Sequence, residues 1–155
     1  MIISADDPHR ADVLALLAQH LGEMHRTSPA ESVHALDPDA LADPSITLLS
    51  AREEDGTLLG IGALQRHDGR LGEVKSMRTA PPARGRGVGA AVLGRIIALA
   101  REEGLETLAL ETGTDPFFAA AHRLYARHGF AQTGPFAEYR EDPCSAYFSL
   151  SLRPA

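Results

Sequence analysis

The sequence lacks several features, and each shortage excludes a class of protein. It has one cysteine, Cys144, so no disulfide can form within the chain, and we expect a cytoplasmic protein, not a disulfide-stabilised secreted one. It has no tryptophan and no excess of basic residues, and its formal net charge is -6. Because an acidic surface repels phosphate groups, we expect no nucleic-acid partner. No apolar run approaches the roughly 20 residues that cross a bilayer, so we expect no membrane partner.

Close pairs of metal ligands are also missing. None of the seven histidines belongs to an H-E-x-x-H motif or a similar pair, so we expect no metal site. What remains is a chain of 155 residues with 44% apolar content, enough to bury a substantial core. We therefore expect residues 1–155 to form a single domain.

Hydrophobic periodicity and turn residues predict a mixed α/β order of elements. The middle of the chain predicts three antiparallel strands, since Asp55-Gly56 and the stretch "HDGR" supply hairpin turns. In order, we expect a strand at 2–3, helices within 9–24 and 37–41, strands within 46–53, 57–67 and 71–79, a helix at 88–103, a strand at 106–112, a helix at 115–129 and strands within 130–134 and 144–152.

The strand predicted at 71–79 carries polar residues in its middle. Simple alternation places Glu73, Lys75 and Met77 on one face and Val74 on the other. This strand leads directly into the most unusual segment of the chain.

That segment, "TAPPARGRGVGAAVLGRII", joins a proline pair and three alternating glycines to a helical pattern. The first N–H groups of a helix have no partner within it and carry partial positive charge, so this position favours an anion, most often a phosphate. Gly85, Gly87 and Gly89 let a ligand approach the backbone, although a tight turn packed against a strand is an alternative. Arg84 and Arg86 either bind the same anion or are solvated.

Two common phosphate motifs fit this loop poorly. A P-loop is excluded, because the lysine followed by serine or threonine is missing. Gly85, Gly87 and Ala90 match the G-x-G-x-x-A pattern of dinucleotide-binding folds, and Glu111 ends the next predicted strand. However, residues 81–83 separate the glycines from their strand, and antiparallel strands precede them. A dinucleotide-binding module therefore stays an alternative only.

The stretch "MRTAPPARGRGVGAAVL" resembles the acetyl-CoA loop of the GNAT superfamily of N-acetyltransferases, in which R/Q-x-x-G-x-G/A opens a helix after a strand. A second block, "AAHRLYARHGF", is similar to the A-x-x-L-Y-x-x-x-G-F signature of that family and contains Tyr125. The resemblance covers roughly residues 46–152. It implies an α/β fold of the GNAT type, with a mixed, mostly antiparallel sheet of about six to seven strands and helices on both faces.

By this resemblance, acetyl-CoA is the cosubstrate, and no metal is needed. The amides of residues 84–90 are expected to bind the pyrophosphate, while the backbone of residues 77–79 pairs with the pantetheine arm like an added strand. The strands at 71–79 and 106–112 are expected to separate around the thioester. The expected cofactor-binding residues are Met77, Arg78, Thr79, Arg84, Gly85, Arg86, Gly87, Val88, Gly89 and Ala90.

The resemblance also implies direct transfer in a ternary complex, in which an amine attacks the acetyl carbonyl and a thiolate leaves. Tyr125 stands where many family members place the acid that protonates the thiolate, although packing is the alternative role. Glu73 is the first candidate for the base, and Glu111 is the second. Glu73 has the alternative of an ion pair with Lys75, and a water relay could replace either base.

The acceptor side gives weaker signals. In "SPAESVHALD", Ser32 and His34 are candidate substrate-binding residues together with Glu111, although a surface loop is an alternative. Tyr139 and Arg140 could help to close the pocket. The sequence also departs from the family pattern, because Phe118 stands where an asparagine often contacts CoA.

We therefore predict an enzyme that acetylates a primary amine of a small molecule. The resemblance is to a branch of bacterial acetyltransferases whose acceptors are poorly defined. A non-catalytic CoA-binding sensor or partner module is the alternative from another class. A homodimer formed through the last strands is a further possibility that the sequence does not decide.

Overall fold

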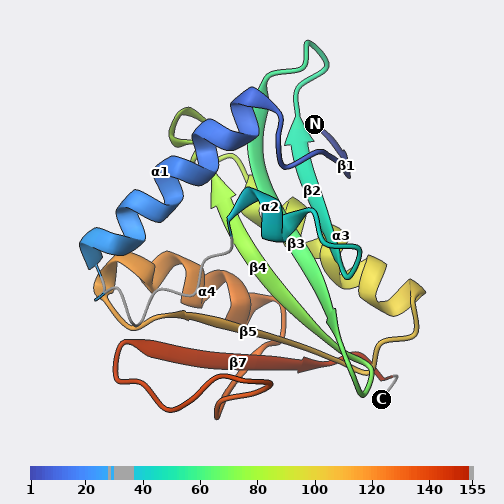
Figure 1. Cartoon of the computed structure of the whole chain (residues 1–155), viewed down its shortest axis with the longest axis vertical. Coiled ribbons are helices and arrows are strands. Elements are labelled where there is room, and N and C mark those ends of the chain that lie inside the picture. Colours follow the sequence, from blue (N-terminus) through green and yellow to red (C-terminus); the bar gives the residue numbers. More distant parts are fainter. Residues whose placement is uncertain (28, 30–36, 154–155) are drawn as a thin grey trace.

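The computed structural model describes residues 1–27, 29 and 37–153. Within these residues, seven strands form one sheet in the order β1-β2-β3-β4-β5-β7-β6 (Figure 1). Strands β4 and β5 pair in parallel, and the other neighbouring strands pair antiparallel. The strands are β1 (Ile2–Ala5), β2 (Ile46–Arg52), β3 (Leu58–His67), β4 (Leu71–Thr79), β5 (Thr107–Gly113), β6 (Ala131–Thr133) and β7 (Ser145–Ser151).

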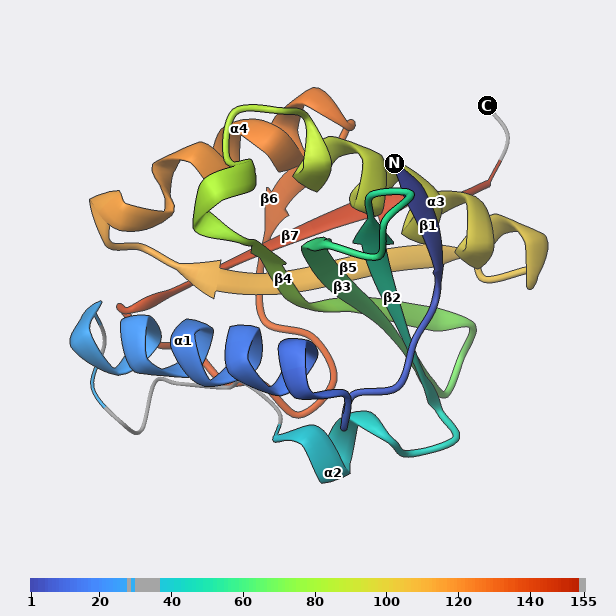
Figure 2. The same ribbon diagram turned by 90° about the horizontal axis from the view of Figure 1, so that it is seen from above.

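Helices cover both faces of this sheet, as the view from above shows (Figure 2). Helices α1 (Ala11–Thr27) and α2 (Pro38–Leu41) lie on one face, whereas α3 (Val88–Glu102) and α4 (Ala119–Arg127) lie on the other. One apolar cluster fills each interface: the smaller lies under α1 and α2, and the larger lies under α3 and α4. The predicted fold class, a mostly antiparallel α/β sheet with helices on both faces, is confirmed.

The parallel pair β4–β5 separates partway along its length. Its register runs from Leu71 opposite Thr107 to Val74 opposite Leu110 and stops there. Just beyond this point, Ser76 has a φ of 57°. Between the pairs Ile61–Arg78 and Ala63–Lys75, β4 has two residues where β3 has one, and this extra residue defines a β-bulge. The bulge bends β4 away from β5, so the sheet opens near its centre.

The bulge also corrects one prediction about β4. Simple alternation placed Met77 on the same face as Glu73 and Lys75, and this is wrong. Met77 packs with Val74 in the larger cluster under α3. The extra residue at Ser76 shifts the alternation by one position, so Met77 returns to the face that Val74 occupies.

The helix predicted at 115–129 is divided in two. Asp115 caps a 3-10 turn, Pro116–Phe118, through its contact of 2.8 Å with the amide of Phe117, and α4 begins only at Ala119. The turn lays the ring of Phe118 against Gly113, where an added Cβ would lie only 2.2 Å from a ring carbon. The 3-10 turn and the absence of a side chain at Gly113 therefore determine where the ring of Phe118 lies.

Candidate functional site

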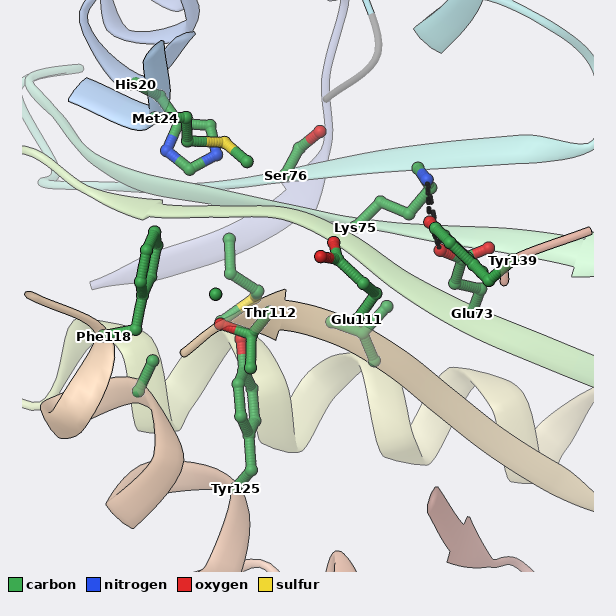
Figure 3. Close-up of a pocket in the computed structure, with 14 residues that line it drawn as sticks. His20, Met24, Glu73, Lys75, Ser76, Glu111, Thr112, Phe118, Tyr125 and Tyr139 are labelled. Carbon is green, nitrogen blue, oxygen red and sulfur yellow. Dashed lines mark hydrogen bonds and ion pairs between the residues drawn. The ribbon is translucent and has the colours of Figure 1, made fainter. Parts of the chain in front are cut away.

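A cavity of about 100 Å³ lies where β4 and β5 separate (Figure 3). Helix α1 lies on one side of it, and α4 with the turn before it lies on the other. A residue of the loop before β7 completes its wall. The lining residues are His20, Met24, Glu73, Val74, Lys75, Ser76, Met77, Glu111, Thr112, Gly113, Phe118, Ala121, Tyr125 and Tyr139.

The glycine loop leads from the end of β4 into α3 through a 3-10 turn, Pro81–Ala83. Gly85 and Gly87 have φ angles of 80° and 78°, a conformation that residues with a Cβ rarely adopt. Gly87 is the N-cap of α3 and offers no side chain to the N–H groups of the first turn. Gly89 has another role, since an added Cβ would lie 3.3 Å from Leu124 of α4. Close packing therefore accounts for Gly89, whereas a phosphate-binding role of Gly85 and Gly87 stays a prediction.

The two arginines of this loop have carboxylate neighbours. A guanidinium nitrogen of Arg86 lies 2.8 Å from a carboxylate oxygen of Glu53. Arg84 lies 3.9 Å from Glu23 of α1. Both arginine side chains are about half exposed, so neither is committed to a buried contact.

Glu73 is the centre of a polar cluster on the α1 face of the sheet. Its side chain is buried, and one carboxylate oxygen lies 2.8 Å from Nε2 of His67. The other oxygen accepts hydrogen bonds from Nζ of Lys75 at 3.1 Å and from the hydroxyl of Tyr139 at 2.6 Å. Burial, followed by the negative charge of Glu73, raises the pKa of Tyr139 well above its ordinary value. The ion pair of Glu73 with Lys75 is thus present, whereas its role as a base stays a prediction.

Tyr125 reaches the cavity from α4, on the opposite side of the sheet (Figure 3). It is 6% exposed, and its ring packs near Phe130 and Phe148. Burial, with a smaller contribution from the carboxylate of Glu111, raises the pKa of its phenol. The hydroxyl therefore holds its proton at neutral pH. Glu111 also lines the cavity, and it accepts a hydrogen bond of 2.7 Å from the hydroxyl of Ser145.

Helix α1 contributes two lining residues that we did not predict, His20 and Met24. Burial, with a smaller contribution from the charge of Arg78, lowers the pKa of His20 to about 4, so its imidazole is neutral at pH 7. The sequence does carry a signal for these residues. They continue the helical spacing of the buried Val13 and Leu17, so a polar residue lies on the stripe that faces the sheet.

Of the other predicted site residues, some line the cavity and others do not. Ser32 and His34 lie outside the described residues. Tyr139 lines the cavity, whereas the backbone carbonyl of Arg140 accepts a hydrogen bond from the hydroxyl of Tyr147. Phe118 lines the cavity at the position where the family often has asparagine. In the described part of the chain, no group of three or more acidic, histidine or cysteine side chains is arranged to hold a metal, and no helix is long and apolar enough to cross a membrane.

Comparison with known proteins gives consistent results. The sequence model of the Acetyltransferase (GNAT) family matches residues 13–130. Uncharacterized N-acetyltransferase YedL of Escherichia coli (strain K12) is 47% identical over 150 residues, which cover 97% of this chain and 94% of that protein. IAA acetyltransferase of Azospirillum brasilense is 40% identical over 154 residues, with 97% of each chain covered.

The fold also matches solved structures. A Klebsiella pneumoniae subsp. pneumoniae MGH 78578 protein, provisionally named an acyl-CoA N-acyltransferase, has a TM-score of 0.80 and 30% identity, with 98% of this chain and 97% of that chain covered. Two more distant neighbours of the same fold were solved with coenzyme A or acetyl-CoA bound.

Proposed function

Because the chain belongs to the GNAT family and is an acetyl-CoA-dependent N-acetyltransferase, we propose that it transfers the acetyl group directly to a primary amine of a small molecule. We also propose that residues 1–155 act as one catalytic domain, since both apolar clusters pack on one sheet. The observation that carries the proposal is the pair of polar groups on opposite faces of the opening: the protonated phenol of Tyr125 on one side and the Glu73 cluster on the other.

The glycine loop binds the pyrophosphate of acetyl-CoA in this proposal. The uncapped N–H groups that follow Gly87 supply donors, and the left-handed Gly85 and Gly87 leave the approach free of side chains. The amide of Ala80 donates to the carbonyl of Leu59 on β3. In a strand, the N–H and C=O groups of one residue point away from those of the next residue. The N–H and C=O groups of Thr79 therefore face the opening, where they pair with the pantetheine arm in this proposal.

The transfer then needs two proton movements. The acceptor nitrogen forms a bond with the acetyl carbon, and the thioester C–S bond breaks. The leaving sulfur takes the proton of the Tyr125 hydroxyl, which is protonated at neutral pH. The proton that the nitrogen loses passes to Glu73, directly or through the hydroxyl of Tyr139 at 2.6 Å.

His67 gives Glu73 a path to the outside. Its imidazole lies 2.8 Å from the carboxylate and is 24% exposed, whereas the carboxylate itself is 3% exposed. Glu111 remains the second candidate for the base, because it lines the same cavity and influences Tyr125 electrostatically.

The choice of a small acceptor rests on the size of the cavity, about 100 Å³, which suits a compact amine better than an extended chain. The cytoplasmic location expected from the cysteine content stays a prediction.

The first test is thermal unfolding with acetyl-CoA, with NAD as the control. A ligand at about 100 times its dissociation constant adds about 2.7 kcal/mol to the free energy of unfolding, which raises the midpoint by several degrees for a domain of this size. Amines are then screened by thiol release, and each product is identified by mass spectrometry. The proposed acceptor would be contradicted if no small amine caused thiol release from acetyl-CoA but a protein became acetylated.

A further inference from the structure

Arg78 of β4 is a buried cation whose neighbours line the cavity, although Arg78 itself is not among the lining residues. Its side chain is 8% exposed and forms an ion pair through Nη1 with Glu23 of α1. It lies on the α1 face of the sheet, whereas its neighbour Met77 packs under α3. His20 and Met24, which lie on the same helix as Glu23, line the cavity. The guanidinium is therefore on the acceptor side of the opening.

Two nitrogens of this guanidinium, Nε and Nη2, are buried without a hydrogen-bond partner in the part of the chain that the structure describes. They form one edge of the planar group, with two parallel N–H bonds. This edge matches the two oxygens of a carboxylate, which bind it through paired hydrogen bonds. A buried guanidinium edge without a partner costs free energy, so its presence indicates a ligand that supplies the acceptors.

The charges around Arg78 also favour an anion. Glu23 lies near two cations, Arg78 and Arg84, and the charge of Arg26 reaches it too. His20 is neutral at pH 7 and does not change this balance. The positive charges at this position therefore exceed the negative charge of Glu23.

The Nε–Nη2 edge of Arg78 is less necessary for binding the cofactor than for binding the acceptor. In the proposed mode, its pyrophosphate is held by the N-terminus of α3, and its pantetheine arm pairs with the backbone of β4. Arg78 instead faces α1, on the side from which the acceptor must reach the acetyl carbon.

We infer that the acceptor is an amine that also carries a carboxylate, as an amino acid does, and that Nε and Nη2 of Arg78 bind this carboxylate. The inference rests on the proposed transfer to a small amine. Arg78 is a specificity residue in this arrangement, since it holds the end of the acceptor that does not react.

The experiment compares acids with their amides. Glycine, β-alanine and phenylalanine are each paired with the corresponding carboxamide, and kcat/KM is measured by thiol release at equal concentrations of uncharged amine. For the acceptor that reacts best, we expect the free acid to exceed the amide by about 10- to 100-fold, as for hydrogen bonds to charged groups. In Arg78→Met the ratio falls to about one. Arg78→Lys keeps the charge but not the two-nitrogen edge, so its ratio is intermediate.

Arg95→Met is the matched control, because Arg95 is 42% exposed on α3 and pairs with Glu102, away from the cavity. It removes one positive charge and should keep the ratio of the original protein. The inference is overturned if the original protein uses acids and amides equally, or if the ratio survives in Arg78→Met. It is also overturned if Arg78→Met raises only the KM for acetyl-CoA, since the edge would then bind the cofactor.

Failure of the proposed function gives a different result, the absence of thiol release with every amine. In that case, N-acetylglycine and N-acetylglycinamide are compared by their effect on the unfolding midpoint of the coenzyme A complex. A larger shift with the acid, lost in Arg78→Met, supports the carboxylate site. Equal shifts, or none, overturn it.

Discussion

The two sides of the opening between β4 and β5 are built in different ways. On the α3 and α4 side, backbone geometry dominates: left-handed glycines precede an uncapped helix, and Tyr125 is held by packing. On the α1 side, polar contacts join residues far apart in the sequence, as Glu73 does with Tyr139. The first side suits a cofactor that all members of a family share, whereas the second is free to differ with the acceptor.

The largest effect should come from the α4 side of this comparison. We expect Tyr125→Phe to lower kcat by roughly 100- to 10,000-fold, because the leaving sulfur loses its proton donor. The midpoint of unfolding should change little, since the ring and its packing remain. Steady-state rates together with thermal unfolding separate these effects. A variant with full kcat would assign Tyr125 a packing role.

The next effect tests the α1 side. We expect Glu73→Gln to lower kcat by roughly 100-fold and to remove the rise of kcat/KM with pH that a catalytic base produces. Glu111→Gln is the matched variant, because it removes a carboxylate from the same cavity. The pH dependence of kcat/KM is measured for both. A normal profile for Glu73→Gln, with loss of the rise in Glu111→Gln, would exchange the two roles.

The sequence predicted one side of the opening better than the other, for a physical reason. Gly85, Gly87 and Tyr125 belong to local patterns, in which spacing along the chain determines geometry. The contact of Glu73 with Tyr139 joins residues 66 positions apart, and no local pattern encodes it. The bulge at Ser76 was also missed, because it depends on how β4 pairs with β3.

A smaller effect concerns α1 and acid stability. His20 has a pKa of about 4 in the folded protein and about 6.5 when unfolded, so the unfolded chain binds more protons between these values. Its contribution to stability is therefore complete above pH 6.5 and is lost as the pH falls toward 4. The total loss is at most roughly 3 to 4 kcal/mol.

We therefore expect His20→Gln to lose less stability than the original protein between pH 6.5 and 4. The free energy of unfolding is measured in urea across this range. Carboxylates such as Asp6, Asp12 and Glu103, whose pKa values are lowered, make both proteins less stable in acid, so the difference between the two proteins is the test. Parallel curves would show that His20 is accessible to protons in the folded state.

The smallest effect compares two glycines near and within α3. Gly87 has a φ of 78°, so Gly87→Ala should lower the free energy of unfolding by about 1–2 kcal/mol and weaken acetyl-CoA binding. Gly94 lies inside α3, with open space where a Cβ would be added. Gly94→Ala should therefore stabilise the protein by about 0.5–1 kcal/mol and leave acetyl-CoA binding unchanged.

The opposite signs distinguish a glycine that the loop conformation requires from one that the helix merely tolerates. Unfolding in urea gives the stabilities, and calorimetric titration gives the affinity for acetyl-CoA. If Gly87→Ala loses stability but keeps its affinity, the left-handed turn serves the fold alone, and the pyrophosphate must bind elsewhere. If Gly87→Ala loses both stability and affinity for acetyl-CoA while Gly94→Ala gains stability, cofactor binding depends on the backbone conformation of the glycine loop.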